Sequence, residues 1–278
     1  MNSSGQKEPE KGIELFNIAK KLIQVQPESI NLSGGDPLTE DCIFKLMEYL
    51  FYEGIILTLS TSGWDFNQQI AKKVIQLCRG GIQFSLDGSI ARTHDHIRGK
   101  QGAFRRVLNS VRIIRKISAD YNIELNLTVN HYNFHEIRDI IHLANHLKVN
   151  TLKVSTLYPL GRTTKHNDLF ISKKKLELVL RDVIETNMIY DIQIYYRDPI
   201  WNLKRVVAQG EKNKLMAITE EGNILIAPYL PFFFGNIFSD SIKDIWDKKM
   251  KNFYSSDVFL NFLKKDVDEK RDGELIWI

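Results

Sequence analysis

Residues 29–38 constrain the fold more than any other part of this sequence. They read Ser-Ile-Asn-Leu-Ser-Gly-Gly-Asp-Pro-Leu, which predicts a short buried strand that ends in two glycines, a carboxylate and a proline. Two adjacent glycines permit positive φ angles and let a ligand approach the backbone closely. Pro37 fixes its own φ and favours an extended Asp36. We therefore expect the Asp36 carboxylate at the carboxyl end of a strand.

Two interpretations of this turn follow from its residues. In parallel α/β proteins, ligands bind at the carboxyl ends of the strands, and a carboxylate there can accept hydrogen bonds from an ammonium or hydroxyl group. A tight turn in which Asp36 caps the next helix explains the same residues. The turn taken alone leaves both interpretations open.

Strand-like and helix-like segments alternate after this turn. Five strands are predicted, with amphipathic helices between them, at about residues 29–33, 55–59, 81–86, 123–129 and 151–158. The apolar run at 55–59 predicts a strand buried on both faces. Such alternation is typical of parallel βα units joined by right-handed crossovers. It predicts an α/β fold and leaves a barrel and an open sheet as alternatives.

The pattern changes beyond residue 165. A Lys-rich helix after Ser172, a short strand at 192–196, a hairpin across 215–226 and a helix from about residue 240 are predicted there. We therefore expect a (β/α) core over residues 1–165 and a small α+β region over residues 166–278.

Charge and hydropathy exclude several classes of protein. The 38 Lys and Arg against 34 Asp and Glu give a net charge of +4 that is spread along the chain, so no nucleic-acid partner is expected. The polar start lacks the apolar segment of a signal peptide. No apolar run is long enough to cross a bilayer, so no membrane partner is expected. Cytoplasmic localisation is the prediction.

Four short motifs follow one another along the first hundred residues. They are Gly34-Gly35-Asp36-Pro37, Ser60-Thr61-Ser62-Gly63, Ser85-Leu86-Asp87-Gly88 and the segment His94-Asp95-His96-Ile97-Arg98-Gly99. Their order resembles the radical S-adenosylmethionine (SAM) superfamily, which carries a GGEP-type motif, a TNG-type strand end, an SLDG strand end and an HDxxRG loop. Residues 221–246 are similar to the SPASM pattern of its peptide- and protein-modifying members, with Ala227 where that pattern has a cysteine.

The resemblance implies a fold and a function. The fold would be a partial (β/α)6 radical SAM-type barrel that lacks its first strand, followed by a small α+β SPASM-like appendage. The function would be SAM-dependent hydrogen abstraction from a peptide or protein substrate. Nine residues would form the SAM-binding site: Gly34, Gly35, Asp36, Pro37, Ser62, Gly63, Ser85, Asp87 and Arg98.

The resemblance also implies a role for each polar member of this set. Asp36 would accept hydrogen bonds from the SAM ammonium, in the place where the family commonly has Glu. Ser85 and Arg98 would meet the SAM carboxylate, for which the guanidinium fork is suited. Asp87 would meet the ribose. Ser62, which replaces the family's Asn, and Gly63 would line the path of the adenosine.

The cysteines do not match the family. The chain has only Cys42 and Cys78 and no CxxxCxxC motif, whose thiolates hold the family's [4Fe-4S] cluster. A cluster is expected only if a CxxxCxxC segment exists upstream, and no residue here is predicted to be catalytic or to ligate a metal. Two hypotheses follow: a radical SAM enzyme that is inactive without that segment, and a clusterless, non-catalytic remnant that binds a peptide or partner enzyme through an exposed strand edge.

Overall fold

The computed structural model describes residues 8–157, 166–190, 192–265, 276 and 277. The chain divides into two compact units. Residues 28–157 and 167–197 form one, here called the sheet unit. Residues 1–27, 158–166 and 198–278 form the other, here called the mixed unit. This division differs from the expected boundary at residue 165, because residues 167–197 belong to the sheet unit and the helix Glu8–Leu22 belongs to the mixed unit.

The sheet unit is built on a six-stranded parallel sheet in the order β1-β2-β3-β4-β5-β6. The strands are β1 (Ser29–Leu32), β2 (Ile56–Thr61), β3 (Gly81–Ser85), β4 (Ile123–Val129), β5 (Thr151–Thr156) and β6 (Gln193–Arg197). The prediction of an α/β fold of parallel βα units is confirmed. Among the described residues the sheet is open, with β1 and β6 as its edges.

The sixth strand corrects the sequence prediction, which placed residues 192–196 in the C-terminal region. β6 pairs in parallel with β5, so that Thr151 lies opposite Gln193 and Ser155 opposite Arg197. The strand is short and its alternate side chains are exposed. Its sequence therefore carries too little apolar signal to show membership of a buried parallel sheet.

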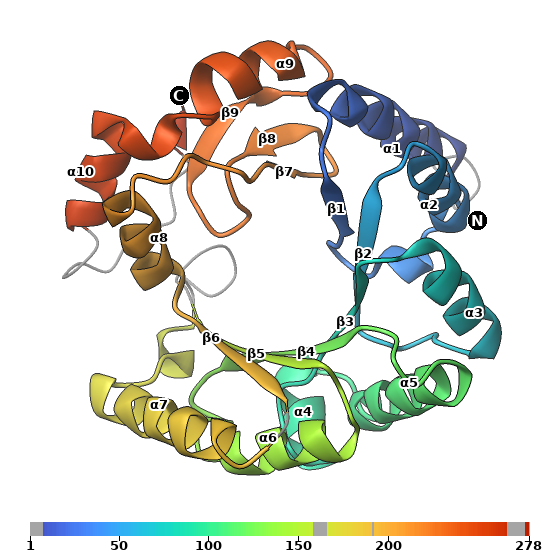
Figure 1. Cartoon of the computed structure of the whole chain (residues 1–278), viewed down its shortest axis with the longest axis vertical. Helices are drawn as coiled ribbons and strands as arrows, with labels where there is room; N and C mark the ends of the chain where they lie inside the picture. Colours follow the sequence, from blue (N-terminus) through green and yellow to red (C-terminus); the bar gives the residue numbers. More distant parts are fainter. Residues whose placement is uncertain (1–7, 158–165, 191, 266–275, 278) are drawn as a thin grey trace, which may run out of the picture. The chain divides into compact units, whose positions relative to one another are not determined.

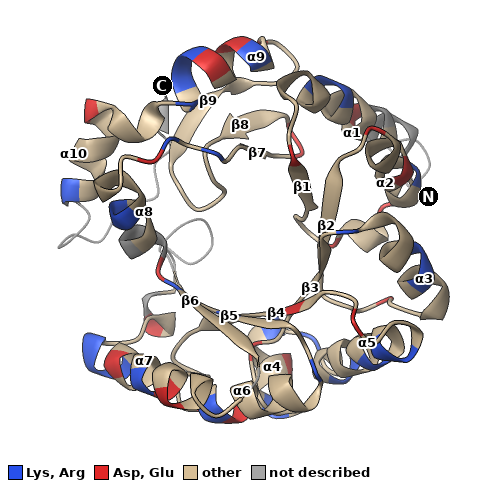
Figure 2. Ribbon diagram, in the orientation of Figure 1, with Lys and Arg blue, Asp and Glu red and all other residues tan. Residues whose placement is uncertain are grey.

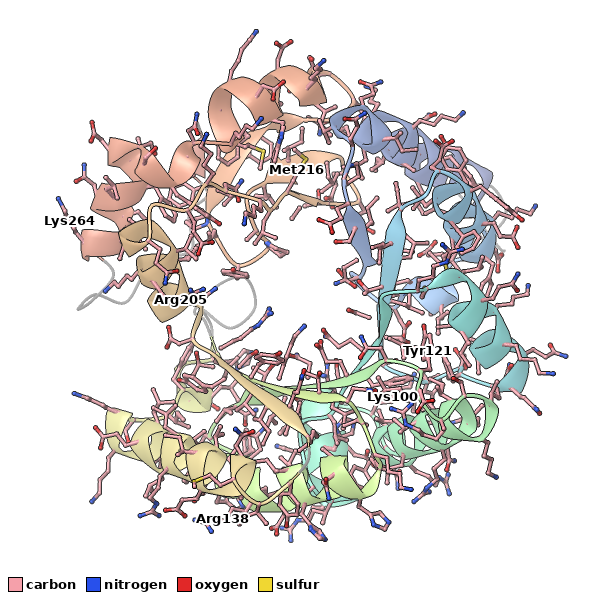
Figure 3. The ribbon with its side chains drawn as sticks, viewed as in Figure 1. Lys100, Tyr121, Arg138, Arg205, Met216 and Lys264 are labelled. Carbon is pink, nitrogen blue, oxygen red and sulfur yellow. The ribbon has the colours of Figure 1, made fainter. Side chains whose placement is uncertain are left out.

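The helices of this unit lie along one face of the sheet (Figure 1). They are α2 (Ile43–Tyr52), α3 (Gln68–Leu77), α4 (Ala91–Arg98), α5 (Ala103–Ile117), α6 (Ile137–His146) and α7 (Lys173–Asn187). Side chains such as Leu57, Leu59 and Phe84 are completely buried against them. Tyr121, labelled in Figure 3, donates a hydrogen bond from its hydroxyl to the Cys78 carbonyl at 2.7 Å and ties β4 to the end of α3.

The other face of the sheet is polar. Alternation along the four central strands places half-buried polar side chains on it: Thr58, Ser60, Gln83, Ser85, Glu124, Asn126, Thr128, Lys153 and Ser155. The prediction that β2 is buried on both faces is therefore wrong. Glu124 and Lys153 form an ion pair across β4 and β5, with 2.5 Å between Oε1 and Nζ. A parallel sheet is usually apolar on both faces, so this polar face needs an explanation other than core packing.

The mixed unit combines helices with a four-stranded sheet in the order β10-β9-β8-β7. Its strands are β7 (Ala217–Ile218), β8 (Asn223–Leu225), β9 (Phe232–Asn236) and β10 (Ile276–Trp277). Its helices are α1 (Glu8–Leu22), α8 (Pro199–Ala208), α9 (Ile242–Asp244), which runs on as a π-helical turn, and α10 (Asp257–Lys265). The antiparallel β7–β8 pair confirms the predicted hairpin.

An aromatic core holds the mixed unit together. The ring of Phe232 lies 4.9 Å from that of Phe253 and 4.7 Å from that of Phe262, measured between centroids. Ile18 of α1 belongs to the same buried cluster, so the first helix packs with the C-terminal elements.

Positively and negatively charged side chains lie along the outer helices (Figure 2). Arg138 of α6, labelled in Figure 3, pairs with Asp182 of α7 at 2.8 Å. Within the described part of the chain, no helix has the length and apolar character needed to span a membrane.

Candidate functional site

The GGDP turn leads from β1 into a short 3-10 turn, Pro37–Thr39. Gly34 has φ of 124°, which a side chain rarely adopts, and no heavy atom lies within 4 Å of a Cβ built at Gly34 or Gly35. Both glycines are exposed. Asp36 is extended, with φ of −134° and ψ of 112°, as the following proline predicts. The backbone of this turn is therefore open to a ligand.

The Asp36 carboxylate joins the ends of β1 and β2. It accepts hydrogen bonds from the Thr61 hydroxyl at 2.8 Å, the Ser62 N–H at 3.0 Å and the Ser62 hydroxyl at 2.5 Å. It also accepts from the Leu38 N–H at 3.3 Å and so caps the 3-10 turn. Asp36 therefore caps this short turn, whereas the helix α2 begins at Ile43 without a side-chain cap. These four donors match the about four lone-pair sites of a carboxylate. A donor from a ligand would therefore have to replace one of them, and the hydroxyl of the exposed Ser62 is the one that can rotate away.

Gly63 is a packing position. Its φ is 71°, and a Cβ there would lie 3.0 Å from the Ser110 hydroxyl and 3.2 Å from the Phe84 ring. Gly63 is buried, whereas Ser62 is exposed. Of the two residues predicted at this strand end, Ser62 is the one that a ligand can reach.

The HDxxRG segment fastens the loop after β3. The His94 Nδ1 accepts a hydrogen bond from the Asp87 N–H at 3.0 Å. The Asp95 carboxylate accepts from two backbone N–H groups at the start of α5, those of Gly102 at 2.6 Å and Phe104 at 2.8 Å. Arg98 pairs with Asp87, with 2.8 Å between Nη2 and Oδ2. Each of the three motif residues thus fixes a different part of the β3–α4–α5 connection.

The pair of Asp87 and Arg98 changes the roles that sequence reasoning gave them. Asp87 is 3% exposed, and its second oxygen accepts a hydrogen bond from the Thr128 N–H at 2.9 Å. Burial raises the pKa of Asp87, and the positive charge of Arg98 opposes that rise. Both carboxylate oxygens are engaged, so Asp87 acts on Arg98 and is not presented to a ligand. The Arg98 side chain is 35% exposed and keeps further N–H donors for a carboxylate.

The polar residues of this site share one edge of the sheet. Asp36 follows β1, Ser62 follows β2, Ser85 ends β3, and Arg98 lies in the helix after β3. All six strands are parallel, so their carboxyl ends meet at the same edge. Ser85 lies on the polar face, opposite Asn126 in register.

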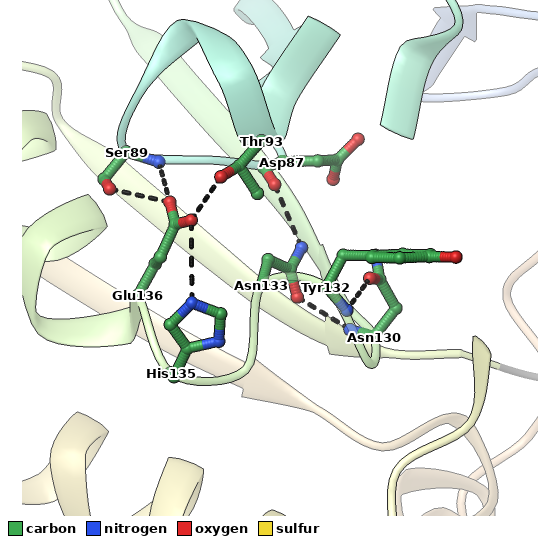
Figure 4. A network of polar contacts seen from close by, with 8 residues as sticks. All are labelled: Asp87, Ser89, Thr93, Asn130, Tyr132, Asn133, His135 and Glu136. Carbon is green, nitrogen blue, oxygen red and sulfur yellow. Dashed lines mark hydrogen bonds and ion pairs between the residues drawn. The ribbon is translucent and has the colours of Figure 1, made fainter. Parts of the chain in front are cut away.

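Sequence reasoning missed two residues that support this edge, Asn133 and Glu136 (Figure 4). The Asn133 side-chain amide donates to the carbonyls of Asp87 at 3.1 Å and Thr128 at 3.0 Å. The Glu136 carboxylate accepts from the N–H and the hydroxyl of Ser89, each at 2.7 Å. The contacts to Asp87 and Ser89 span 46 and 47 positions of the chain, and no local motif indicates them.

The residues present do not fit an iron–sulfur cluster. Cys78 is completely buried, and burial raises the pKa of its thiol to about 12, which disfavours the thiolate that iron binds. Cys42 is half-buried and precedes α2. Among the described residues, no group of three or more His, Cys, Asp and Glu side chains could hold a metal ion. An open turn, a carboxylate and a guanidinium at one edge fit the groups of SAM better.

Several curated proteins are similar in sequence. An AdoMet-dependent heme synthase of Methanosarcina barkeri is 28% identical over 238 residues, which cover 78% of this chain and 67% of that protein. Mycofactocin maturase MftC of Mycobacterium ulcerans is 26% identical over 166 residues, 58% of this chain and 44% of the maturase. Against two further heme synthases the chain spans 50% and 44% of the relative's length.

Solved structures share the fold. SuiB of Streptococcus suis bound to precursor peptide SuiA has a TM-score of 0.67 at 12% identity, covering 91% of this chain and 60% of SuiB. AnSMEcpe with bound AdoMet has a TM-score of 0.64 at 15% identity, covering 91% of this chain and 73% of the anSMEcpe chain. The family model of the Radical SAM superfamily matches residues 6–189. This range includes the open GGDP turn and the whole segment from Asp87 to Arg98. The chain therefore belongs to the radical SAM superfamily.

Proposed function

We propose that this chain binds SAM and the substrate in a cytoplasmic radical SAM protein that modifies a peptide or protein by hydrogen abstraction. SAM would lie against the carboxyl edge of the sheet. The exposed turn at Gly34 and Gly35 would admit its amino acid group, with Asp36 accepting from the ammonium. Arg98, oriented by the buried Asp87, would meet the carboxylate, and Ser62 and Ser85 would offer hydroxyl groups along the same edge. No nucleic-acid or membrane partner is part of this proposal.

An iron–sulfur cluster belongs to this proposal only if a CxxxCxxC segment exists upstream of these residues. When bound, such a cluster supplies the electron that cleaves SAM. The thiolates of Cys42 and Cys78 are too few and wrongly placed for it. The contribution of the present residues is to bind and orient SAM and the substrate, and the 278 residues alone would bind SAM without cleaving it.

The polar face of the sheet is the observation that favours a peptide substrate. In the Glu124–Lys153 pair, a carboxylate that accepts hydrogen bonds lies beside an ammonium that donates them. The flanking side-chain amides of Gln83 and Asn126 each carry both a donor and an acceptor. Main-chain amides of a peptide need this pairing of donor and acceptor. A tetrapyrrole, the kind of molecule named by the heme synthase relatives, has a broad apolar ring that this face would leave poorly covered.

A binding experiment can test the peptide assignment. The chain is immobilised with SAM and challenged with a random peptide library and, separately, with haem. We expect the selection to enrich peptides. Their affinity for Asn126→Leu should be at least tenfold lower than for the wild type, a loss of about 1.4 kcal/mol. We expect no saturable haem binding. Val179→Ala, a core change in α7 away from this face, is the matched control.

Two results would contradict the proposal. One is saturable haem binding that no peptide of the library displaces. The other is peptide enrichment that persists without SAM and survives Asn126→Leu, which would favour the non-catalytic remnant that binds a partner through a strand edge.

A further inference from the structure

Glu136 is a buried carboxylate that does not serve its own helix. It occupies the position just before α6 but makes no capping hydrogen bond there. A short carboxylate such as that of Asp normally accepts from the first N–H groups of the helix in that position, and a negative charge is favourable there. Glu136 is 7% exposed, and its burial needs partners that offset the loss of hydration.

The groups that donate hydrogen bonds to it all come from the segment after β3. The N–H and the hydroxyl of Ser89 lie 2.7 Å from one carboxylate oxygen, and the hydroxyl of Thr93 donates to the other. The exposed His135 ring lies 3.9 Å away. Figure 4 shows Glu136 reaching across to Ser89 and Thr93 while Asn133 holds the Asp87 carbonyl. Hydrogen bonds to an ionised acceptor are about twice as strong as neutral ones.

These contacts lead directly to Arg98. Thr93 lies in the first turn of α4 and Arg98 is its last residue, so one rigid helix of eight residues joins them. Ser89 is two positions after Asp87, the buried partner of Arg98. A shift of the loop at Ser89 and Thr93 would therefore move both members of the Asp87–Arg98 pair.

We propose that Glu136 is a positioning residue for SAM, which fixes the loop after β3 so that Arg98 is held where the SAM carboxylate arrives. Glu136 itself touches neither SAM nor substrate. The inference rests on the proposed function in one respect, that Arg98 meets SAM; the contact of Glu136 with the loop does not depend on it.

The test compares Glu136→Gln with the wild type. Glutamine keeps the shape and one acceptor oxygen, but it replaces the other oxygen with an NH2 group and removes the negative charge. Ser89 or Thr93 therefore loses its acceptor, and the loop is held less firmly. We expect the dissociation constant for SAM, measured by equilibrium dialysis, to rise about tenfold. Amide hydrogen exchange at Ser89 should also become faster. Glu136→Asp, which keeps the charge on a shorter side chain, should restore part of the affinity.

Matched controls separate positioning from general destabilisation. Val179→Ala truncates a completely buried side chain of α7 in the same unit and should lower thermal stability without changing SAM affinity. Glu185→Gln removes a half-exposed carboxylate that pairs with Arg138 and should change neither.

Two outcomes would overturn the inference: unchanged SAM affinity in Glu136→Gln, or a loss of affinity in Val179→Ala as large as in Glu136→Gln. A wild-type chain that does not bind SAM would refute the proposed function instead. Exchange at Ser89 would then still decide whether Glu136 holds the loop.

Discussion

Acid should weaken the fold through His94, because this imidazole is held neutral in the native state. His94 is 1% exposed, and its Nδ1 accepts the Asp87 N–H, which leaves the other ring nitrogen to carry the proton. Burial, helped by the positive charge of Arg98, lowers the pKa of His94 from 6.5 to about 4, although Asp95 opposes this.

The sign and size of the effect follow from linkage. Above pH 6.5 the ring is neutral in both the folded and the unfolded chain. As the pH falls from 6.5 to 4, the unfolded chain takes up a proton that the folded chain excludes, so the free energy of unfolding decreases. Each pKa unit is worth about 1.4 kcal/mol, so a shift from 6.5 to about 4 corresponds to a loss of about 3 kcal/mol.

The measurement is urea unfolding of the wild type and His94→Asn at several pH values between 7.5 and 4, spaced about one pH unit apart. Asparagine can still accept the Asp87 N–H but does not titrate, so the variant should be less stable at neutral pH because of the cavity it leaves. We expect the gap between the two proteins to shrink by about 3 kcal/mol as the pH falls. A gap that stays constant across this range would refute the assignment of His94 as a buried, neutral acceptor.

Three further substitutions have defined outcomes. Asp95→Ala removes the carboxylate that caps α5 and should lower the free energy of unfolding by about 1 to 2 kcal/mol, measured by urea titration, while Asp95→Asn should lose less. Gly88→Ala places a Cβ 2.6 Å from the His94 backbone nitrogen and should cost about 1 to 3 kcal/mol; a neutral result would contradict the tight loop. Phe259→Ala, in the aromatic core of the mixed unit, should cost about 3 to 5 kcal/mol and leave SAM affinity unchanged, which calorimetry and dialysis can check together.

Most of the fold could be predicted because the signals are local. Apolar alternation marked five of the six strands of the sheet unit, and the twin glycines and Pro37 marked the turn after β1. The strand at 192–196 was predicted as well, but not its place in the parallel sheet, because β6 is short and presents alternating exposed side chains. The apolar run at 55–59 gave a false prediction of burial on both faces, because Ile56 is exposed and Thr58 lies on the polar face.

Sequence motifs could name candidate site residues but not the contacts between them. The motifs identified Asp36, Asp87 and Arg98, yet the pairing of Asp87 with Arg98 depends on the conformation of the loop between them. Asn133 and Glu136 escaped entirely, since the residues that they hold after β3, Asp87 and Ser89, lie more than forty positions away in the chain. Contacts between loops of neighbouring strands become visible only when the strand order is known.

SAM titration followed by amide chemical shifts of the isotope-labelled chain tests the central claim most directly. We predict saturable shifts at Gly34, Gly35, Ser62 and Ser85, together with the side-chain Nε–H of Arg98. Saturable shifts confined to the recess at the opposite edge of the sheet, lined by Asn122, Lys148 and Asn150 among others, or no shifts at millimolar SAM, would contradict a cofactor site at the carboxyl ends of the strands.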